Sequence, residues 1–337
     1  MKKCVFLLVV ICVLSCTNND NEKGKWGFGK EQKLTFNLLS LNDYIYKPTW
    51  IEVFDSLLLV YDPVDGMNYT IYNINTLKPV MSGASKGEGP NDIMYGQFVD
   101  KINDKEFQVS DLVAKKVLVF NIDSILEKRA FRPQRRISFK QQTDNPIEIM
   151  YYLNDSTQIA LGPFQTGKYA LLSGDTTTYW GEHPAELETN SNPFFIHQGV
   201  MQINSSRDCI LYHSPLGFYY EILNYKNNSL TKIGGEYELT EFKFDCSTEN
   251  TIKGMNAADF TDNEIFMMFS GRTNKEYPSD SFLADNILVC NLDGKKLKHY
   301  KTDRSNVCIS VDGKKRRIYC ICQNPENYEF EIGYYQY

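Results

Sequence analysis

The chain has 337 residues, which is enough for one large domain or two ordinary ones. Charged residues make up 23% and apolar residues 42%, values typical of a globular protein. The formal net charge is −6, and a mildly acidic chain is a poor nucleic-acid binder because phosphate neutralisation needs a basic face. The 22 Tyr and 20 Phe favour pleated, half-buried surfaces, so the composition already indicates β structure.

The N-terminus has the pattern of an export signal. Lys2 and Lys3 precede an apolar run of about ten residues, 5–14, whereas a helix that spans a bilayer needs about 20. The run ends in Val-Leu-Ser-Cys at residues 13–16, which resembles the lipobox of bacterial lipoproteins. We therefore expect residues 1–15 to be a lipoprotein signal peptide. The alternative is an ordinary secretory signal with an incidental cysteine.

The lipobox resemblance implies that Cys16 is lipidated and anchors the protein to a membrane. Residues 16–32 then form the lipidated cysteine and a flexible polar tether. Thr17, rather than Asp, follows the cysteine, as in lipoproteins sent on to the outer membrane. We expect a protein of the cell envelope, on its periplasmic or surface face, with no nucleic-acid partner. Loss of Lys2 and Lys3 with the signal would bring the net charge from −6 to −8.

Six of the nine cysteines remain once the signal peptide is removed and Cys16 is lipidated. Most lie in strand-like segments, where scattered cysteines behave as small buried hydrophobes. One disulfide is compatible with export, but no spacing resembles a zinc site. The six cysteines are Cys209, Cys246, Cys290, Cys308, Cys320 and Cys322.

A unit of about 50 residues recurs along the chain. Its markers are polar turns at residues 55, 104, 155, 207, 263 and 313, which are 49, 51, 52, 56 and 50 residues apart. Each turn is followed by an apolar strand-like segment: residues 57–61, 106–110, 158–161, 209–213, 265–269 and 318–322. A third strand rich in aromatics follows in every unit, and a fourth is recognisable in several. Four antiparallel strands per 50-residue unit are typical of propeller blades.

Six such units predict an all-β, six-bladed β-propeller of four-stranded antiparallel blades over residues 33–337. The last unit ends after its third strand, which would leave an open edge at the seam of the ring. Residues 33–39, Lys-Leu-Thr-Phe-Asn-Leu-Leu, are strand-like, and we expect this N-terminal strand to close the ring. The alternative, a β-sandwich with a second β domain, fits the even period less well.

Two local motifs resemble TolB-like six-bladed propeller lipoproteins of the Bacteroides group. Residues 310–314, Ser-Val-Asp-Gly-Lys, are similar to the Ser-x-Asp-Gly-Lys hairpin of those blades, where Asp-Gly suits a tight turn with positive φ. Residues 83–93, Gly-Ala-Ser-Lys-Gly-Glu-Gly-Pro-Asn-Asp-Ile, resemble the Gly-rich link between the first two blades, with Asn-Asp where Gly-Glu is frequent. The resemblance implies the fold and the envelope address, and it carries over no catalytic residues.

The same Gly-rich link is the first candidate for contact with a ligand. Gly-rich loops present backbone N–H groups to anions, but a phosphate cradle would need Gly-Lys-Ser/Thr and a helix after it, and here Pro90 ends the loop. We expect a strained crossover in which glycine supplies unusual backbone angles. Lys86, Glu88 and Asp92 are still candidates for a ligand face, because links between blades lie near a channel mouth.

Trp180, His183 and His197 are candidate aromatic or rim residues, since Trp180 could stack on a sugar and the two histidines flank one loop-like stretch. No histidine spacing matches a metal motif and no nucleophile elbow is present, so we expect no metal, no cofactor and no assignable catalytic residue. The leading hypothesis is a binding or scaffolding propeller for a glycan, a peptide or an envelope protein. The alternative is a propeller-type hydrolase or lyase with a metal or carboxylate site in the channel.

Overall fold

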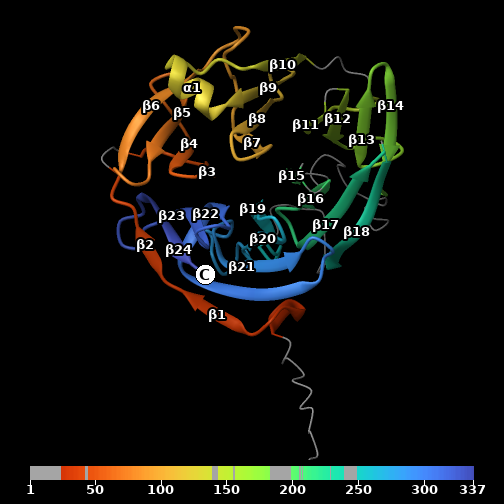
Figure 1. Ribbon diagram of the computed structural model, residues 1–337. Helices are drawn as coiled ribbons and strands as arrows, with labels where there is room; N and C mark the ends of the chain where they lie inside the picture. Colours follow the sequence, from red (N-terminus) through yellow and green to blue (C-terminus); the bar gives the residue numbers. More distant parts are fainter. Residues whose placement is uncertain are drawn as a thin grey trace, which may run out of the picture.

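The computed structural model describes residues 24–41, 45–138, 143–154, 156–182, 199–204, 206, 208–227, 229–238 and 249–337. Strands β2 to β24 form antiparallel sheets that are arranged as blades around a central axis, and β1 adds to the outside of one of them (Figure 1). The prediction of an all-β, six-bladed propeller is confirmed. Within the described ranges, no helix is long and apolar enough to cross a membrane.

Four of the blades are separate sheets with the strands in sequence order. Blade 1 contains β3 (Trp50–Phe54), β4 (Leu57–Val64), β5 (Met67–Asn73) and β6 (Lys78–Ser85). Blade 2 contains β7 (Phe98–Lys101), β8 (Glu106–Asp111), β9 (Lys116–Asn121) and β10 (Arg135–Ser138), with helix α1 (Ile122–Lys128) between its last two strands. Blade 3 contains β11 (Ile149–Asn154), β12 (Thr157–Leu161), β13 (Tyr169–Ser173) and β14 (Thr176–Trp180). Blade 4 contains β15 (Val200–Asn204), β16 (Cys209–His213), β17 (Phe218–Lys226) and β18 (Ser229–Glu238).

Blades 5 and 6 share one long strand. Blade 5 contains β19 (Met255–Phe260), β20 (Glu264–Phe269), β21 (Ala284–Asn291) and the first part of β22 (Lys296–Asp312). The second part of β22 is the innermost strand of blade 6, followed by β23 (Arg317–Gln323) and β24 (Phe330–Gln336). No loop separates these two blades, because the outer strand of one continues directly into the inner strand of the next.

The N-terminal strand closes the ring, as expected. β2 (Phe36–Leu38) pairs antiparallel with β24 and supplies the fourth strand of blade 6 (Figure 1). Gly333 of β24 lies against this strand, and a Cβ there would come within 2.4 Å of the Asn37 carbonyl oxygen. The seam therefore depends on a position without a side chain.

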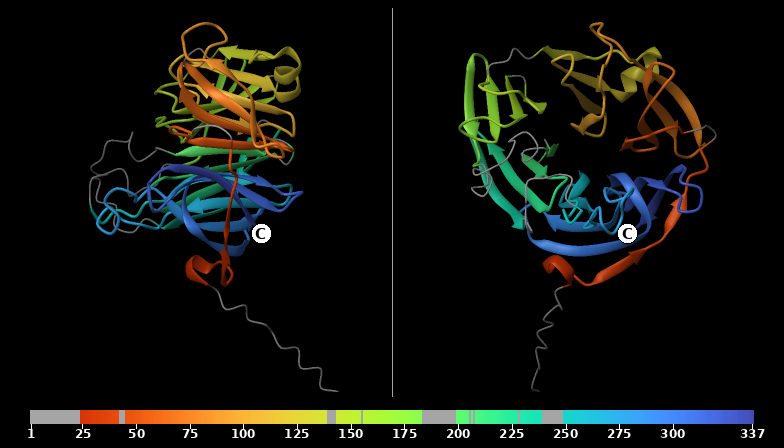
Figure 2. Two further views of the ribbon diagram at one scale, coloured as in Figure 1. Left: turned by 90° about the vertical axis from the view of Figure 1, so that its left-hand side faces the viewer. Right: turned by 180° about the vertical axis from the view of Figure 1, so that it is seen from behind.

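The packed part of the chain begins earlier than residue 33. β1 (Glu31–Leu34) pairs in parallel with β22, and the single turn of 3₁₀ helix η1 (Lys25–Gly27) precedes it. The Trp26 ring packs edge-on against Phe269, with centroids 4.9 Å apart, and lies near Phe218 and His299. We expected a flexible tether up to residue 32, but residues 24–32 lie along the rim of the ring in both views of Figure 2. The polar composition of this segment concealed its two anchoring aromatics, Trp26 and Phe28.

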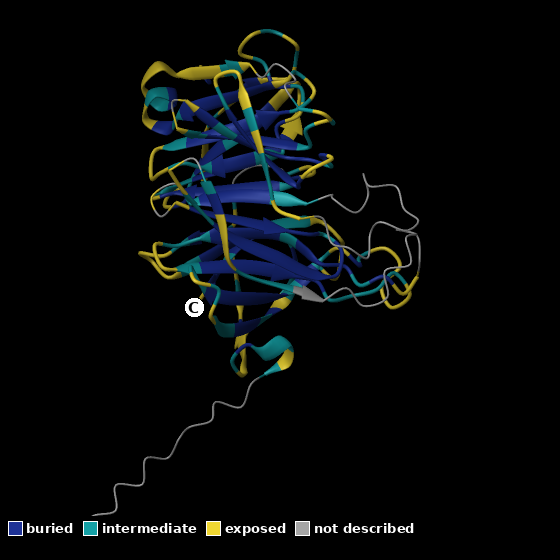
Figure 3. Ribbon diagram, turned by 90° about the vertical axis from the view of Figure 1, so that its right-hand side faces the viewer, coloured by how far each residue is buried: buried dark blue, intermediate teal, exposed yellow. Residues whose placement is uncertain are grey.

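The interior of each blade is buried, and the exposed residues gather in the turns at the two faces (Figure 3). Buried aromatics fill the wedges between neighbouring blades, as between blades 1 and 2, where Phe107 stacks on Phe120 and contacts Tyr69. The five cysteines in the described ranges are free and buried, as expected of small hydrophobes, and Cys246 lies outside those ranges. Cohesion between blades is therefore largely apolar and aromatic.

A buried polar cluster joins blade 3 to blade 4. Lys168 is fully buried, and its Nζ lies 2.7 Å from Glu221 Oε2 and 3.8 Å from the centroid of the Tyr212 ring. The hydroxyl groups of Tyr169 and Tyr219 donate to the same carboxylate. Burial lowers the pKa of Lys168 to about 8, although Glu221 opposes this shift. Lys168, Glu221, Tyr169, Tyr212 and Tyr219 are called the blade 3–4 lock below.

Candidate functional site

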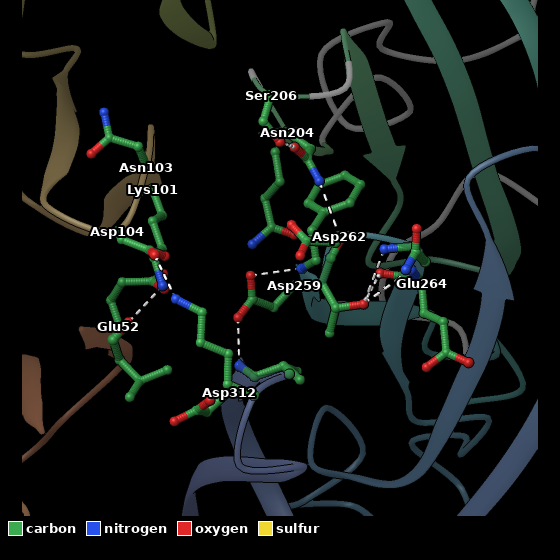
Figure 4. Close-up of a pocket in the computed structure, with 18 of the residues that line it drawn as sticks. Glu52, Lys101, Asn103, Asp104, Asn204, Ser206, Asp259, Asp262, Glu264 and Asp312 are labelled. Atoms are coloured by element: carbon green, nitrogen blue, oxygen red, sulfur yellow. Dashed lines mark hydrogen bonds and ion pairs between the residues drawn. The ribbon is translucent and has the colours of Figure 1, made fainter. Parts of the chain in front are cut away.

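A cavity of about 1000 Å³ opens at one mouth of the central channel (Figure 4). The turns after the inner strands of blades 2, 4, 5 and 6 line it, together with Asp55 in the corresponding turn of blade 1. Blade 3 contributes none of the described lining residues. The site is therefore built by five blades from positions that recur once in each sequence repeat.

Buried polar side chains form the floor of this cavity. Glu52, Asp100, Gln202 and Asp259 come from the inner strands β3, β7, β15 and β19, and Ser310 of β22 lies beneath them. Each is at least nine-tenths buried, and each lies three to five residues before the polar turn of its repeat. Five blades thus each bring one buried polar side chain to the channel.

Ser310 connects two of the carboxyl groups. Its Oγ lies 3.0 Å from Glu52 Oε1 and 3.0 Å from Asp259 Oδ2, and it accepts a hydrogen bond from the backbone N–H of Val53 at 3.1 Å. Asp259 also accepts the backbone N–H groups of Phe260 and Val311. These hydrogen bonds join blade 5 to blade 6 and blade 6 to blade 1 at the channel, on both sides of the blade that closes the ring.

Asp100 makes the corresponding connection across the channel. It accepts the backbone N–H of Ile203 in blade 4 at 2.8 Å and the side-chain amide of Gln108 at 2.9 Å. Asp100 thereby bonds the inner strand of blade 2 to that of blade 4. Gln108 in turn accepts the backbone N–H of Tyr152, which holds blade 3 against the flank of blade 2. This arrangement explains why blade 3 stands back from the cavity.

Burial favours the neutral form of the floor carboxyl groups. It raises the pKa of Glu52 well above its ordinary value, and the neighbouring charge of Asp259 adds to this shift. Burial likewise raises the pKa of Asp259, and it raises that of Asp100 to about 7. Lys101 is the cation beside them; its Nζ donates to the Val53 carbonyl at 2.7 Å and lies 4.0 Å from Glu52 Oε1. Glu52 and Asp259 thus interact with the same ammonium group.

The rim of the cavity carries exposed ion pairs. Lys314 of blade 6 lies 2.8 Å from Asp104 of blade 2, and Lys315 lies 3.1 Å from Asp55 of blade 1. Figure 4 shows Glu52 and Asp104 on one side of the cavity, with Asp259 and Asp262 on the other. Such exposed pairs contribute little to stability, so a ligand could displace them at small cost.

Lys86, Glu88 and Asp92 lie at the opposite end of blade 2 from this cavity. Their link leads into β7, and β7 ends at the turn that lines the cavity, so the link and the cavity lie at opposite ends of the strand. Lys86 and Glu88 are exposed, whereas the Asp92 carboxylate accepts the backbone N–H of Gly89 within the loop. That these three residues contact a ligand stays a prediction.

The glycines of this link serve a different purpose from the one we expected. Gly83, Gly87 and Gly89 have no positive φ, and the residue with φ of 59° is Ala84. A Cβ on Gly83 would meet the Phe131 ring at 2.3 Å, and one on Gly89 would meet Asp92 at 2.4 Å. Glycine is therefore required by close packing. The expectation of positive φ in the Asp-Gly hairpin is also wrong, because Arg316, and not Gly313, adopts it there.

Trp180 is in β14, the outermost strand of blade 3, where its backbone pairs with Tyr169. It does not line the cavity, and His183 and His197 lie outside the described residues. The floor residues were not among the candidates that the sequence patterns indicated. The signal that could have found them is a polar residue shortly before each repeat turn, within an otherwise apolar strand. In the described part of the chain, no group of three or more His, Cys, Asp or Glu side chains is arranged to hold a metal ion.

Comparisons with known proteins agree with this architecture. Two solved structures with a similar fold are the RRP9 WD40 repeats and U3-55K, each with a TM-score of 0.50. The first is 6% identical and covers 89% of this chain and 97% of that one; the second is 7% identical and covers 90% and 98%. At such identities the likeness concerns the fold alone. No curated protein matches the sequence.

The family comparison is more specific than the structural one. The model of the TolB-like 6-blade propeller-like family matches residues 27–314, which includes β1, the ring-closing strand β2 and the Ser-Val-Asp-Gly-Lys hairpin. The match extends over most of the chain and agrees with the six blades seen in the structure. The chain therefore belongs to the TolB-like six-bladed propeller family.

Proposed function

We propose that this protein is an envelope-anchored lipoprotein whose propeller binds a ligand in the cavity at the channel mouth. The observation that carries the proposal is the cavity itself, which is about 1000 Å³ in volume and has a buried polar floor supplied by four inner strands. Ligand sites are typically preformed concavities of this size with a few convergent polar groups. A purely structural component would need no such floor.

The envelope address rests on the sequence and on the family. TolB-like propellers are usually associated with the cell envelope. The lipobox-like Cys16 lies eight residues before Gly24, a span of at most about 28 Å. Labelling with radioactive palmitate tests the anchor: we expect incorporation into the wild type and none into Cys16→Ser. Equal labelling of both would refute lipidation at this residue.

Two serines at equivalent turn positions allow a matched test of the cavity. Ser206 lines the cavity, and Ser156 occupies the same place in blade 3, which does not; the hydroxyl of each donates to the Asn two residues before it. We would measure thermal unfolding of the chain from Thr17 against glycans and peptides. A ligand at a hundred times its Kd adds about 2.7 kcal/mol of stability.

We expect Ser206→Trp to abolish the ligand-induced rise in Tm, since the indole would fill the mouth of the cavity. Ser156→Trp should leave that rise unchanged. A ligand that stabilises both variants as well as the wild type would place binding elsewhere. The absence of any shift across the panel would count against a small-ligand site and favour a scaffolding role.

The enzymatic alternative has one observation in its favour. Glu52 and Asp259 are buried, have raised pKa values and share Ser310, which is the environment of a general acid–base pair. If the propeller is a hydrolase or lyase, a glycan or peptide that binds in the cavity should be cleaved, and Glu52→Gln should abolish cleavage while retaining binding. A bound ligand that is recovered intact after long incubation would refute this alternative.

A further inference from the structure

The floor of the cavity contains more hydrogen-bond acceptors than donors. Glu52, Asp100 and Asp259 are carboxyl groups, and Lys101 is the cation that interacts with Glu52 and Asp259. The backbone N–H groups of Ile203, Phe260 and Val311 satisfy part of this demand. They are neutral donors, however, so the floor would carry an excess of negative charge if all its carboxyl groups were ionised, and burial makes that charge costly.

Gln202 provides an independent sign that a donor is absent from the floor. Its side chain is 5% exposed and lines the cavity. Its Nε2 donates to the Ala258 carbonyl, whereas its Oε1 is buried and accepts no hydrogen bond. Buried side-chain acceptors are nearly always paired, so an orphaned one at the bottom of a cavity points to a ligand with a hydrogen to donate.

The hydrogen bonds around Ser310 indicate how the charges of Glu52 and Asp259 are balanced. A hydroxyl group has one hydrogen, yet the Ser310 Oγ is within bonding distance of both Glu52 and Asp259. If both carboxyl groups were ionised, one of them would face a lone pair of the serine. One extra proton on the two carboxyl groups satisfies every hydrogen bond, since a protonated Glu52 can donate to Ser310 while Ser310 donates to Asp259. The floor without a ligand therefore holds a proton that an added cation can replace.

We infer that the floor of the cavity binds a primary ammonium group of the ligand, an inference that rests on the proposed function of the cavity as a binding site. An ammonium group brings three N–H donors and one positive charge to a site that offers Gln202 Oε1 and the neighbouring carboxylates. The two 3.0 Å distances at Ser310 place the Glu52 and Asp259 oxygens no more than about 6 Å apart, a gap that one ammonium nitrogen can bridge. A lysine side chain and an amino sugar both carry this group.

A metal ion fits the floor less well than an ammonium group. Both oxygens of Asp100 and both of Asp259 already accept N–H or O–H donors, which leaves few lone pairs directed at one centre. Metal cations of the Ca²⁺ type require six to eight oxygen ligands, whereas an ammonium group is satisfied by three acceptors. The described residues hold no cluster arranged for a metal.

Competition between the ammonium group and the proton gives this site a characteristic pH dependence. The titratable and charged groups that face Glu52 and Asp259 are Lys101 and Asp100 of β7 and Cys308 of β22, and Tyr151 of β11 faces Asp100. Burial raises the pKa values of the thiol and the phenol, which stay neutral near pH 7, so the carboxyl groups dominate the change. Binding should therefore release about one proton per ligand and tighten as the pH rises from 5.5 to 7.5.

Isothermal titration calorimetry with the chain from Thr17 tests the inference. The probes are two matched pairs: acetyl-Gly-Lys-Gly-amide with its Nε-acetyl form, and the glucosamine trimer with its fully N-acetylated form. We expect the ammonium member of one pair to bind at least about tenfold more tightly than its acetylated partner. The pair that responds identifies a peptide or an amino sugar as the source of the group. Titration in two buffers of different ionisation enthalpy measures the released proton.

Variants locate the ammonium group on the floor. Gln202→Met removes the orphaned acceptor at similar volume, and Glu52→Gln removes one of the paired carboxyl groups; each should weaken binding at least about tenfold. Asp175→Asn makes the same change of charge in an exposed turn of blade 3 and should leave binding unchanged. Circular dichroism verifies that each variant is folded. If one of the two floor variants does not fold, the other provides the test by itself.

Three results would overturn the inference. They are failure of both ammonium probes to bind, equal binding of the acetylated probes, and unaltered binding by both floor variants. Any other ligand whose binding Ser206→Trp abolishes would still support the cavity as the binding site. Binding that survives Ser206→Trp would instead refute the proposed function. Failure of the ammonium inference is thus distinguishable from failure of the proposed binding site.

Discussion

The blade 3–4 lock allows a quantitative test of how this ring holds together. In Lys168→Met the ammonium group is replaced by a thioether of similar length, and Glu221 is left buried with the hydroxyls of Tyr169 and Tyr219 and the more distant Lys232, whose Nζ is 3.4 Å away. Removing one partner of a buried ion pair costs about 3–5 kcal/mol. The remaining donors place the expected loss near the lower limit, at about 3 kcal/mol.

The loss can be expressed as a change in melting temperature. An unfolding entropy of about 2.1 cal/mol/K per residue gives roughly 0.6 kcal/mol/K for a domain of this size. A loss of about 3 kcal/mol should therefore lower Tm by about 5 °C. Differential scanning calorimetry at pH 7 measures this shift. Glu221→Gln should also lower Tm, because it leaves Lys168 buried without its counter-ion.

The double variant Lys168→Met/Glu221→Gln is the decisive control. With both charges removed, no uncompensated ion remains between the blades, and we expect most of the lost stability to return. Additive losses in the double variant would show that the two residues act independently. A Tm for Lys168→Met equal to that of the wild type would refute the role assigned to the lock.

Three other predictions concern the seam, the N-terminal segment and the floor. Gly333→Ala should cost about 1–3 kcal/mol and loosen β2, because the new methyl group would meet the Asn37 carbonyl; an unchanged Tm would contradict this role. Trp26→Ala should make residues 24–34 susceptible to limited proteolysis while the blades stay intact, and equal protection in both proteins would argue against anchoring by this ring. Burial raises the pKa of Asp100 from 3.8 to about 7, so the folded state binds an extra proton between these values and stability from this group falls as the pH rises from about 4 to 7. Asp100→Asn should flatten that part of the pH profile of urea unfolding, and parallel profiles would refute the shift.

The blades and their number could be predicted from the sequence because the determinants are local. Each repeat combines a polar turn with an apolar second strand, and these segments become β4, β8, β12, β16, β20 and β23. Strand pairing within a blade joins neighbours in sequence, so turn chemistry and alternation specify it directly. The unpaired edge of the last repeat similarly predicted the N-terminal strand that closes the ring.

The N-terminal segment and the Gly-rich link were harder to predict, because their determinants are tertiary. Polar composition suggested a tether up to residue 32, yet Trp26 finds its aromatic partners in blades 4 and 5. The glycines of the link suggested unusual backbone angles, yet Phe131, about 50 residues away, requires Gly83 to lack a side chain. Neither partner can be identified from sequence patterns that compare only neighbouring positions.

Turns, alternation and a missing edge, all within about 50 residues, are sufficient to specify the six blades, their strand order and the closing strand. The site, in contrast, is formed only in the folded ring. Glu52 and Ser310 are 258 residues apart, and they meet because ring closure places blade 6 beside blade 1. Asp100 reaches blade 4 because blade 3 stands back from the channel. A ring brings together one position from each repeat, so the chemistry at its centre depends on how the blades are arranged around the axis.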